Sequence, residues 1–188
     1  MLKSKYSVDL IKQMAECDAN YIRLLKLIPQ LAVYRDMTLS SPVKSVKGSA
    51  YAARCLNRVP GSQNENLVGL KVEFAISESL ESNEPVTVRI EILESFRYTN
   101  TLEIVQKPEM KKLLTNPAMT VRIYHDASSA EVISTQGHKV SQARYLVKNP
   151  NMYYADEKMR VNAFLGEWLT HCLKVGRSIQ APEELLKI

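Results

Sequence analysis

The sequence is poor in the residues that build disulfide frameworks and metal sites. Its 188 residues include only three cysteines, Cys17, Cys55 and Cys172, an odd number with no CxxC spacing. Its three histidines show neither HxH nor HExxH spacing. These patterns argue against a disulfide scaffold and a zinc knuckle, so we expect no metal and no cofactor. A reducing compartment, the cytoplasm, is the simplest interpretation of the cysteine usage.

Long apolar runs and the common catalytic loops are also absent. No window of roughly eighteen residues is apolar throughout, so we expect no membrane-spanning helix. The first residues, MLKSKYSVDL, carry charge with no apolar stretch behind them, so we expect no signal peptide. The sequence contains no GxSxG, Walker or GxGxxG motif, and the usual signatures of serine hydrolases and nucleotide-binding folds are therefore missing.

The charge balance is mildly basic. Lys and Arg number 25 against 20 Asp and Glu, which gives a net charge of +5. This charge admits an anionic ligand or a nucleic acid without requiring either. The most basic stretch contains Lys44, Lys47, Arg54 and Arg58, and we interpret it as a solvated loop in preference to a nucleic-acid surface.

Two amphipathic helices are predicted near the ends of the chain. The first covers residues 7–28, begins near Ser7 and is stopped by Pro29. Its apolar face, which either packs on the protein's own sheet or forms the seam of a homodimer, consists of Leu10, Met14, Cys17, Tyr21, Leu24 and Ile28. The second helix covers residues 156–176 and ends at Gly176. Gly166 inside it suggests close approach to the sheet.

Six segments between these helices are predicted to be strands. They are residues 67–77, 85–93, 101–106, 120–125, 130–134 and 139–147. The first two alternate apolar and polar residues with a period of two, which is typical of half-buried antiparallel strands. The sequence therefore predicts a single α+β domain over residues 1–188, with an antiparallel meander of five to six strands and both helices packed on it. Its element order is similar to that of type III secretion chaperones. Residues 36–66, rich in Ser, Pro, Gly and Asn, are predicted to be an insertion or mobile connection.

A meander brings alternate turns to the same end of the sheet, and this places a candidate site. The turns at 97–98 and 126–130 and the segment around residue 144 are expected to form one polar rim. The expected ligand-binding residues are Arg97, Tyr98, Arg122, Tyr124, Arg144 and Tyr145, because guanidinium groups suit phosphate and carboxylate. The candidate acid–base residues are His125, Asp126 and Glu131. His125 and Asp126 are neighbours that face opposite sides of a strand, whereas Glu131 can meet His125 across the hairpin.

Three functions remain open for the protein: two use this rim, and the third uses the basic residues between 44 and 58. The first is a non-catalytic binding or regulatory protein that contacts an anionic small molecule or a protein partner. The second is a hydrolase of a phosphorylated or nucleotide-like compound, and the third is a nucleic-acid-binding protein. In a purely structural alternative, the same side chains satisfy one another and buried backbone groups.

Several segments resemble the YqiB-like bacterial proteins, a family of unknown function. They are ESFRYTNTLEIVQ, MTVRIYHDASSAEV, ARY and DEKMRVNAFLGEWLTHCL, together with the N-terminal helix around Asp9, Met14, Cys17, Asn20, Arg23 and Pro29. The resemblance covers about three quarters of the chain, and it departs from the family between about Tyr34 and Pro85. It implies that a site, where one exists, draws on the exposed polar members of these motifs, and that Trp168 and Cys172 belong to the core. Genes of the family commonly lie near those of nucleotide-hydrolysing enzymes, which favours a nucleotide-related or regulatory role.

Overall fold

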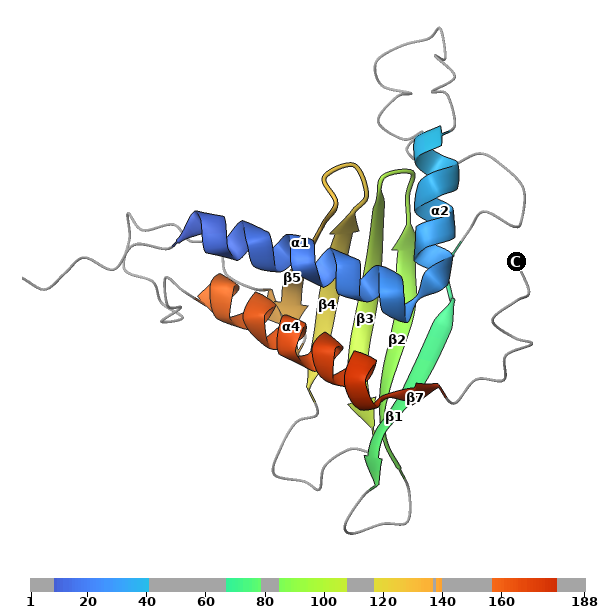
Figure 1. Cartoon of the computed structure of the whole chain (residues 1–188), viewed down its shortest axis with the longest axis vertical. Coiled ribbons are helices and arrows are strands. Elements are labelled where there is room, and N and C mark those ends of the chain that lie inside the picture. The colour runs from blue at the N-terminus through green and yellow to red at the C-terminus, as the bar shows by residue number, and fades with distance from the viewer. Residues whose placement is uncertain are drawn as a thin grey trace, which may run out of the picture.

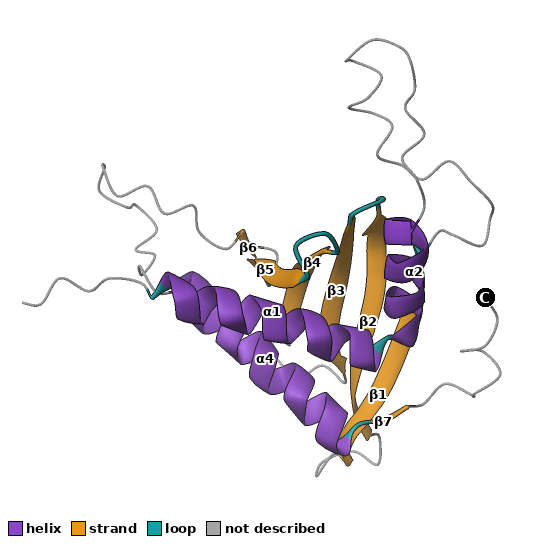
Figure 2. Ribbon diagram, turned by 45° about the horizontal axis from the view of Figure 1, so that its top comes forward, coloured by secondary structure: helices purple, strands orange, loops and turns teal. Residues whose placement is uncertain are grey.

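The protein forms an antiparallel sheet with helices on one face (Figures 1 and 2). The computed structural model describes residues 9–40, 67–78, 85–107, 117–136, 138–139 and 157–178. Five long strands run in chain order as a meander: β1 Lys71–Glu78, β2 Pro85–Ser95, β3 Thr99–Lys107, β4 Ala118–Tyr124 and β5 Ser129–Thr135. The predicted α+β class and meander are confirmed.

Two short strands flank the meander. β6 His138–Lys139 pairs with β5, and β7 Arg177–Ser178 pairs with β1, so the sheet order is β6-β5-β4-β3-β2-β1-β7. Of the sixth predicted strand, only residue 139 is described, and the others lie outside the described residues. β7 was not predicted, because two residues are too few to show a period.

The N-terminal helix ends where the sequence predicts, and its N-cap is Asp9. Helix α1, Leu10–Leu27, begins at Asp9, whose carboxylate accepts a hydrogen bond of 3.1 Å from the Lys12 N–H. The predicted start near Ser7 lies outside the described residues. Pro29 ends α1 as predicted, but it also opens a second helix, α2 Pro29–Ser40, which was not predicted. Proline suits the first position of a helix because it lacks only an N–H that would be unpaired there.

Helix α2 also changes the predicted connection. Residues 36–40 belong to α2, and residues 41–66 lie outside the described residues. No helix in the described parts of the chain is long and apolar enough to cross a membrane.

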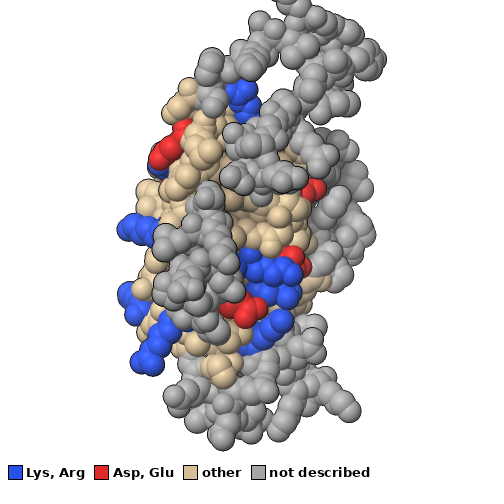
Figure 3. Space-filling model, turned by 90° about the vertical axis from the view of Figure 1, so that its right-hand side faces the viewer, with Lys and Arg blue, Asp and Glu red and all other residues tan. Residues whose placement is uncertain are grey.

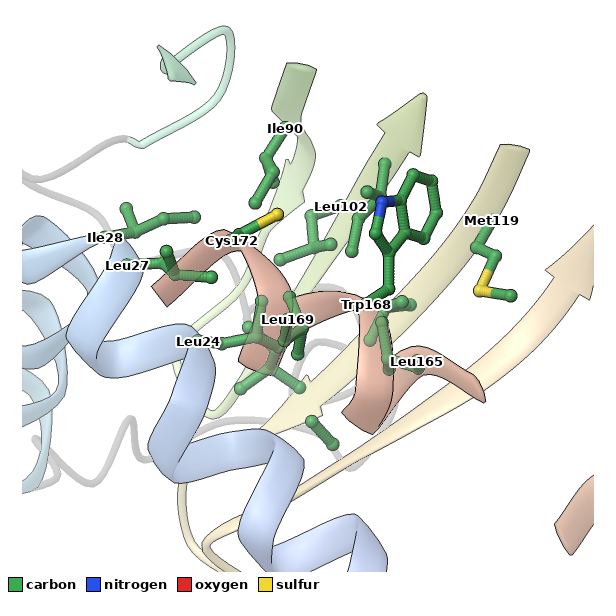
Figure 4. Close-up of a cluster of buried hydrophobic side chains, with 14 of the residues drawn as sticks. Leu24, Leu27, Ile28, Ile90, Leu102, Met119, Leu165, Trp168, Leu169 and Cys172 are labelled. Carbon is green, nitrogen blue, oxygen red and sulfur yellow. The ribbon is translucent and has the colours of Figure 1, made fainter. Parts of the chain in front are cut away.

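The core lies between α1, α4 (Glu157–Val175) and the sheet (Figure 4). Leu24 and Leu27 of α1 and the following residue, Ile28, pack with four residues of α4 over three residues of the strands. The α4 residues are Leu165, Trp168, Leu169 and Cys172, and the strand residues are Ile90, Leu102 and Met119. The expected core positions of Trp168 and Cys172 are thus observed, at 8% and 2% exposure. The inner part of the predicted α1 face packs on the protein's own sheet, whereas Leu10 and Met14 are 65% and 66% exposed.

Gly166 lies where α4 approaches α1. A Cβ at this position would meet the Glu16 carboxylate, and it would lie 2.8 Å from the Arg23 guanidinium and 3.0 Å from the Asn20 amide oxygen. The close approach therefore occurs between the two helices, not against the sheet as the sequence suggested. At the end of α4, the Gly176 N–H donates to the Cys172 carbonyl at 2.9 Å, which agrees with the predicted helix end.

Two buried asparagines join the helices to the sheet. The Asn20 side chain of α1 donates to the main-chain oxygen of Asn162 at 2.9 Å. The side-chain oxygen of Asn162 accepts the Val132 N–H of β5 at 3.0 Å, and its amide nitrogen donates to the Lys158 carbonyl at 2.8 Å. Neither asparagine is exposed to solvent. This network satisfies an outward-facing amide of β5 that would otherwise be buried without a partner.

Asn162→Ala is therefore expected to lower the free energy of unfolding by about 1–3 kcal/mol, the usual cost of an unsatisfied buried polar group. Urea denaturation followed by circular dichroism measures this change. Glu167→Ala, at an exposed position of the same helix, is the matched control and is expected to stay within about 0.5 kcal/mol of the wild type. Equal midpoints for the two variants would contradict a stabilising role for the network.

Candidate functional site

The two turns that the meander predicts to be neighbours do meet. The β2–β3 turn and the β4–β5 turn lie at the same end of the sheet, at the top of Figure 1. The His125 N–H donates to the Tyr98 carbonyl at 2.8 Å, which continues the β3–β4 ladder beyond the Thr99–Tyr124 pair. The turn that carries Arg97 and Tyr98 therefore contacts the turn that begins at His125, and the guanidinium carbon of Arg97 lies 5.3 Å from the Tyr98 ring centroid.

His125 lies in a buried polar cluster on the helix side of the sheet. Its Nε2–H points at the Asn100 side-chain oxygen at 2.5 Å, and Nδ1 faces the Tyr21 hydroxyl at 3.3 Å. The Asn100 amide nitrogen in turn donates to the Ser95 hydroxyl at 2.9 Å, which fixes the orientation of the amide. The Tyr34 ring also packs against the imidazole, with its centroid 5.7 Å away. We call Tyr21, Tyr34, Asn100 and His125 the histidine cluster.

This environment keeps the imidazole neutral. Burial, and then the positive charge of Arg35, lower the pKa of His125 to about 4. The side chain is only 1% exposed, and both ring nitrogens face protein groups. The histidine cluster therefore joins α1 and α2 to the β4–β5 turn, and the arrangement is that of a structural clasp.

A second polar assembly crosses the opposite face of the sheet. No helix in the described parts of the chain covers this face, which we call the open face (Figures 1 and 2). One residue from each of four neighbouring strands lies directly opposite the next across the sheet. They are Glu94 of β2, Thr101 of β3, Arg122 of β4 and Glu131 of β5. We call these four residues the charge row. The Thr101 hydroxyl donates to the Glu94 carboxylate at 2.8 Å, and the Arg122 guanidinium lies 3.8 Å from that carboxylate. The Arg122 Nε lies 3.5 Å from the Thr101 hydroxyl, at the limit of a hydrogen bond.

The two ends of the charge row differ. Glu131 accepts a hydrogen bond of 3.0 Å from the Tyr124 hydroxyl. It also forms an ion pair of 2.5 Å with Lys158 of α4. Burial and the hydrogen bond to Glu131 raise the pKa of Tyr124. At the other end, the side chains of Glu94 and Arg122 are 49% and 41% exposed. The carboxylate at the β5 end is therefore closely paired, and we call this the closed end of the row. The charges at the β2 end are exposed and more loosely paired, and we call this the open end.

A β-bulge places Glu94 in the charge row. Val88, Ile90 and Ile92 alternate onto the core face, so an uninterrupted strand would turn Glu94 towards the helices. The register shifts between Ile92 and Glu94, and this moves Glu94 to the open face opposite Thr101. Sequence reasoning did not single out Glu94 or Thr101, whereas Lys158 belongs to the motifs from which the resemblance draws a site. For Glu94, the only available signal was the break in alternation at Leu93.

The structure separates the predicted site residues into different environments. Arg122, Tyr124 and Glu131 share the open face, whereas His125 lies on the helix side. Asp126 is exposed, and its carboxylate accepts a hydrogen bond from the Ala127 N–H at 3.0 Å. The three candidate acid–base residues, His125, Asp126 and Glu131, are therefore not brought together. The remaining predicted residues, Arg144 and Tyr145, lie outside the described residues.

The described residues offer few other reactive groups. Burial raises the pKa of the Cys17 and Cys172 thiols to about 11, and a protonated, enclosed thiol is a poor nucleophile. No group of three or more His, Cys, Asp or Glu in the described ranges is arranged to hold a metal ion. On the side of the molecule that carries β1 and β7, the visible Lys and Arg side chains are interspersed with Asp and Glu (Figure 3).

These features define an α+β protein with one helix-covered sheet face and one open, polar face. The sequence profile of a family described as protein of unknown function (DUF1249) matches residues 63–178, and the chain belongs to this family. The match begins at residue 63, so β1 lies inside the family segment. The sequence had assigned β1 to the part that departs from the family.

The relatives include the uncharacterized protein YqiB of Escherichia coli strain K12 and the same-named proteins of strains O6:H1 and O157:H7. Each is 43% identical to this chain over 88 residues, which are 47% of the chain and 63% of the relative. The chain thus matches less than two thirds of the length of these relatives. No solved structure matches the chain, so the likeness to the element order of secretion chaperones stays a prediction.

The histidine cluster predicts a pH dependence of stability. The pKa of His125 is about 4 in the folded protein, and about 6.5 is usual for an unfolded chain. Between these values the unfolded chain binds the proton and the folded protein does not. The contribution of neutral His125 is therefore complete above about pH 6.5 and is lost as the pH falls towards 4, by on the order of 3 kcal/mol.

Urea titrations between pH 7 and pH 4 test this prediction. His125→Gln retains hydrogen-bonding groups without the titration, so its unfolding free energy is expected to fall less steeply than that of the wild type. His171→Gln, at an exposed position of α4, is expected to follow the wild-type curve. Parallel curves for the wild type and His125→Gln would show that the imidazole is not held neutral.

Proposed function

We propose that this protein is a non-catalytic binding protein that holds an anionic ligand on the open sheet face. Arg122 is the central residue of the proposed site, and Tyr124 lies two residues further along the same face of β4. The geometry favours a ligand with a carboxylate or phosphate group, because a guanidinium offers paired N–H donors to such groups.

The observation that carries this proposal is the loose attachment of Arg122. Its guanidinium lies 3.8 Å from the Glu94 carboxylate and 3.5 Å from the Thr101 hydroxyl, and 41% of its side chain is exposed. A structural arginine usually forms shorter, paired hydrogen bonds. The Arg122 guanidinium also lies beside the Tyr124 hydroxyl, where its charge partly offsets the rise that burial causes in the pKa of Tyr124. The long contacts to Glu94 and Thr101, on a side chain that stays 41% exposed, support a role in holding a ligand.

The hydrolase alternative has less support. A general acid or base must reach the reacting group directly or through one water, and His125 is enclosed by the histidine cluster. Glu131 is held by Tyr124 and Lys158 on the other face. The nucleic-acid alternative relied on the basic residues between 44 and 58, which lie outside the described residues.

We place this binding function in the cytoplasm. Cys17 and Cys172 are free thiols, and no CxxC spacing occurs in the sequence. Free cysteines are typical of reducing compartments, and they support this assignment.

Arg122→Ala is the direct test. A thermal-shift screen with carboxylates, inorganic phosphate and nucleotides is expected to find anions that stabilise the wild type, and calorimetry then measures their affinity. Loss of a charge-assisted hydrogen bond of about 1.5–3 kcal/mol predicts roughly 10- to 100-fold weaker binding in Arg122→Ala. An unchanged affinity in this variant would rule out the proposed site.

Lys71→Ala is the matched control for this test. Lys71 lies on the same open face but on β1, where it forms an ion pair of 3.3 Å with Glu91. Its removal subtracts one positive charge from the face without touching the charge row. We expect it to retain wild-type affinity, and an equal loss in both variants would indicate general electrostatic attraction.

A further inference from the structure

The open end of the charge row carries two opposite charges, not one. Glu94 and Arg122 lie on either side of Thr101, and both side chains are nearly half exposed. An anion that binds Arg122 therefore comes close to the Glu94 carboxylate, which is only 3.8 Å from the guanidinium. A ligand with negative charge alone is repelled by that carboxylate.

Glu94 is held in this place by two independent features. The bulge between Ile92 and Glu94 turns the side chain from the core face to the open face. The Thr101 hydroxyl then donates to the carboxylate at 2.8 Å and orients it beside Arg122. Thr101 is itself only 5% exposed, so its side chain is buried beneath and between the two charged groups.

At the closed end of the row, the Glu131 carboxylate has both a hydrogen-bond donor and a cation as close partners. Glu131 receives both a hydroxyl from Tyr124 and an ammonium from Lys158, at 3.0 and 2.5 Å. Glu94 accepts a hydrogen bond from the Thr101 hydroxyl at a similar distance, but its nearest cation in the described ranges is the Arg122 guanidinium, at 3.8 Å. Among the residues that the structure describes, no cation lies as close to Glu94 as Lys158 lies to Glu131.

We propose that the ligand is a small zwitterion, such as a free amino acid, whose carboxylate binds Arg122 and whose ammonium group binds Glu94. This inference rests on the proposed function, because it uses Arg122 as the anion site. A ligand with both charges exchanges the loose Glu94–Arg122 pair for two close pairs, and it leaves no buried or repelled charge. The charge row thus selects against simple anions of the same size.

The experiment compares amino acids with matched anions that lack the ammonium group. Alanine is paired with propionate, and glutamate with glutarate, and calorimetry measures each affinity for the full chain. We expect an amino acid to bind the wild type at least tenfold more tightly than its matched anion. Unblocked dipeptides, whose charges lie farther apart, distinguish peptide termini from free amino acids as the source of the same chemistry.

Glu94→Gln decides the inference by the sign of its effect. For a zwitterion, this variant removes an attractive charge, and affinity is expected to fall at least tenfold. For a simple anion, it removes a repulsive charge, and affinity is expected to rise. Glu103→Gln, a carboxylate of β3 on the same open face that pairs in register with Glu91 and Thr120, is the matched control and is expected to change neither.

The possible outcomes separate this inference from the proposed function. Binding of simple anions that strengthens in Glu94→Gln and is lost in Arg122→Gln would overturn the zwitterion and retain the anion site. Binding that is insensitive to Arg122→Gln, or no binding of either ligand class, would overturn both. Circular dichroism and urea midpoints establish that each variant folds, which is expected because Glu94 and Arg122 are half exposed.

Discussion

The structure depends on the burial of one face of a twisted antiparallel sheet under α1 and α4. Because side chains alternate along every strand, this single contact assigns each strand residue to the core or to the open face. Val121 and Ile123 face the helices, and Arg122 between them must face solvent. The positions of the histidine cluster and the charge row follow from this alternation, and they lie on opposite sides of the same strands.

Alternation also explains why the predicted rim divides into two assemblies. The sequence places His125, Tyr124 and Arg122 within four residues, and the meander brings their neighbours to one end of the sheet. His125 continues the phase of Val121 and Ile123 beyond the end of β4, so it enters the helix side. The meander therefore placed these residues at the correct end of the sheet. It did not bring them into one site, because His125 and Arg122 face opposite sides of the sheet.

The parts of the fold that were predictable carry a strong period. The five long strands and the two outer helices follow from alternation and from amphipathic spacing. Helix α2 was missed because Pro29 was treated only as a stop, although the same residue suits the start of the next helix. The bulge at Glu94 leaves one residue out of phase, and a single break in alternation does not distinguish a bulge from the end of a strand. The environment of His125 depends on Tyr21 and Asn100, which lie far from it in sequence.

The two polar assemblies also differ in what they contribute to stability. Asn20, Asn162 and the histidine cluster are enclosed, so each missing partner would leave a buried polar group unsatisfied. The Glu94–Arg122 pair is half exposed, and such pairs usually contribute about 0–1 kcal/mol to folding.

This difference in stability explains how one sheet can both hold the fold together and present a binding site. The enclosed asparagines and the histidine cluster fix the strands, the turns and the helices, and they tolerate little rearrangement. The charge row takes its geometry from those same strands, but the fold gains little from the contact between its outer charges. Glu94 and Arg122 are therefore held at a defined spacing by a scaffold that does not need them to pair, which is the condition under which a ligand can separate them at small cost.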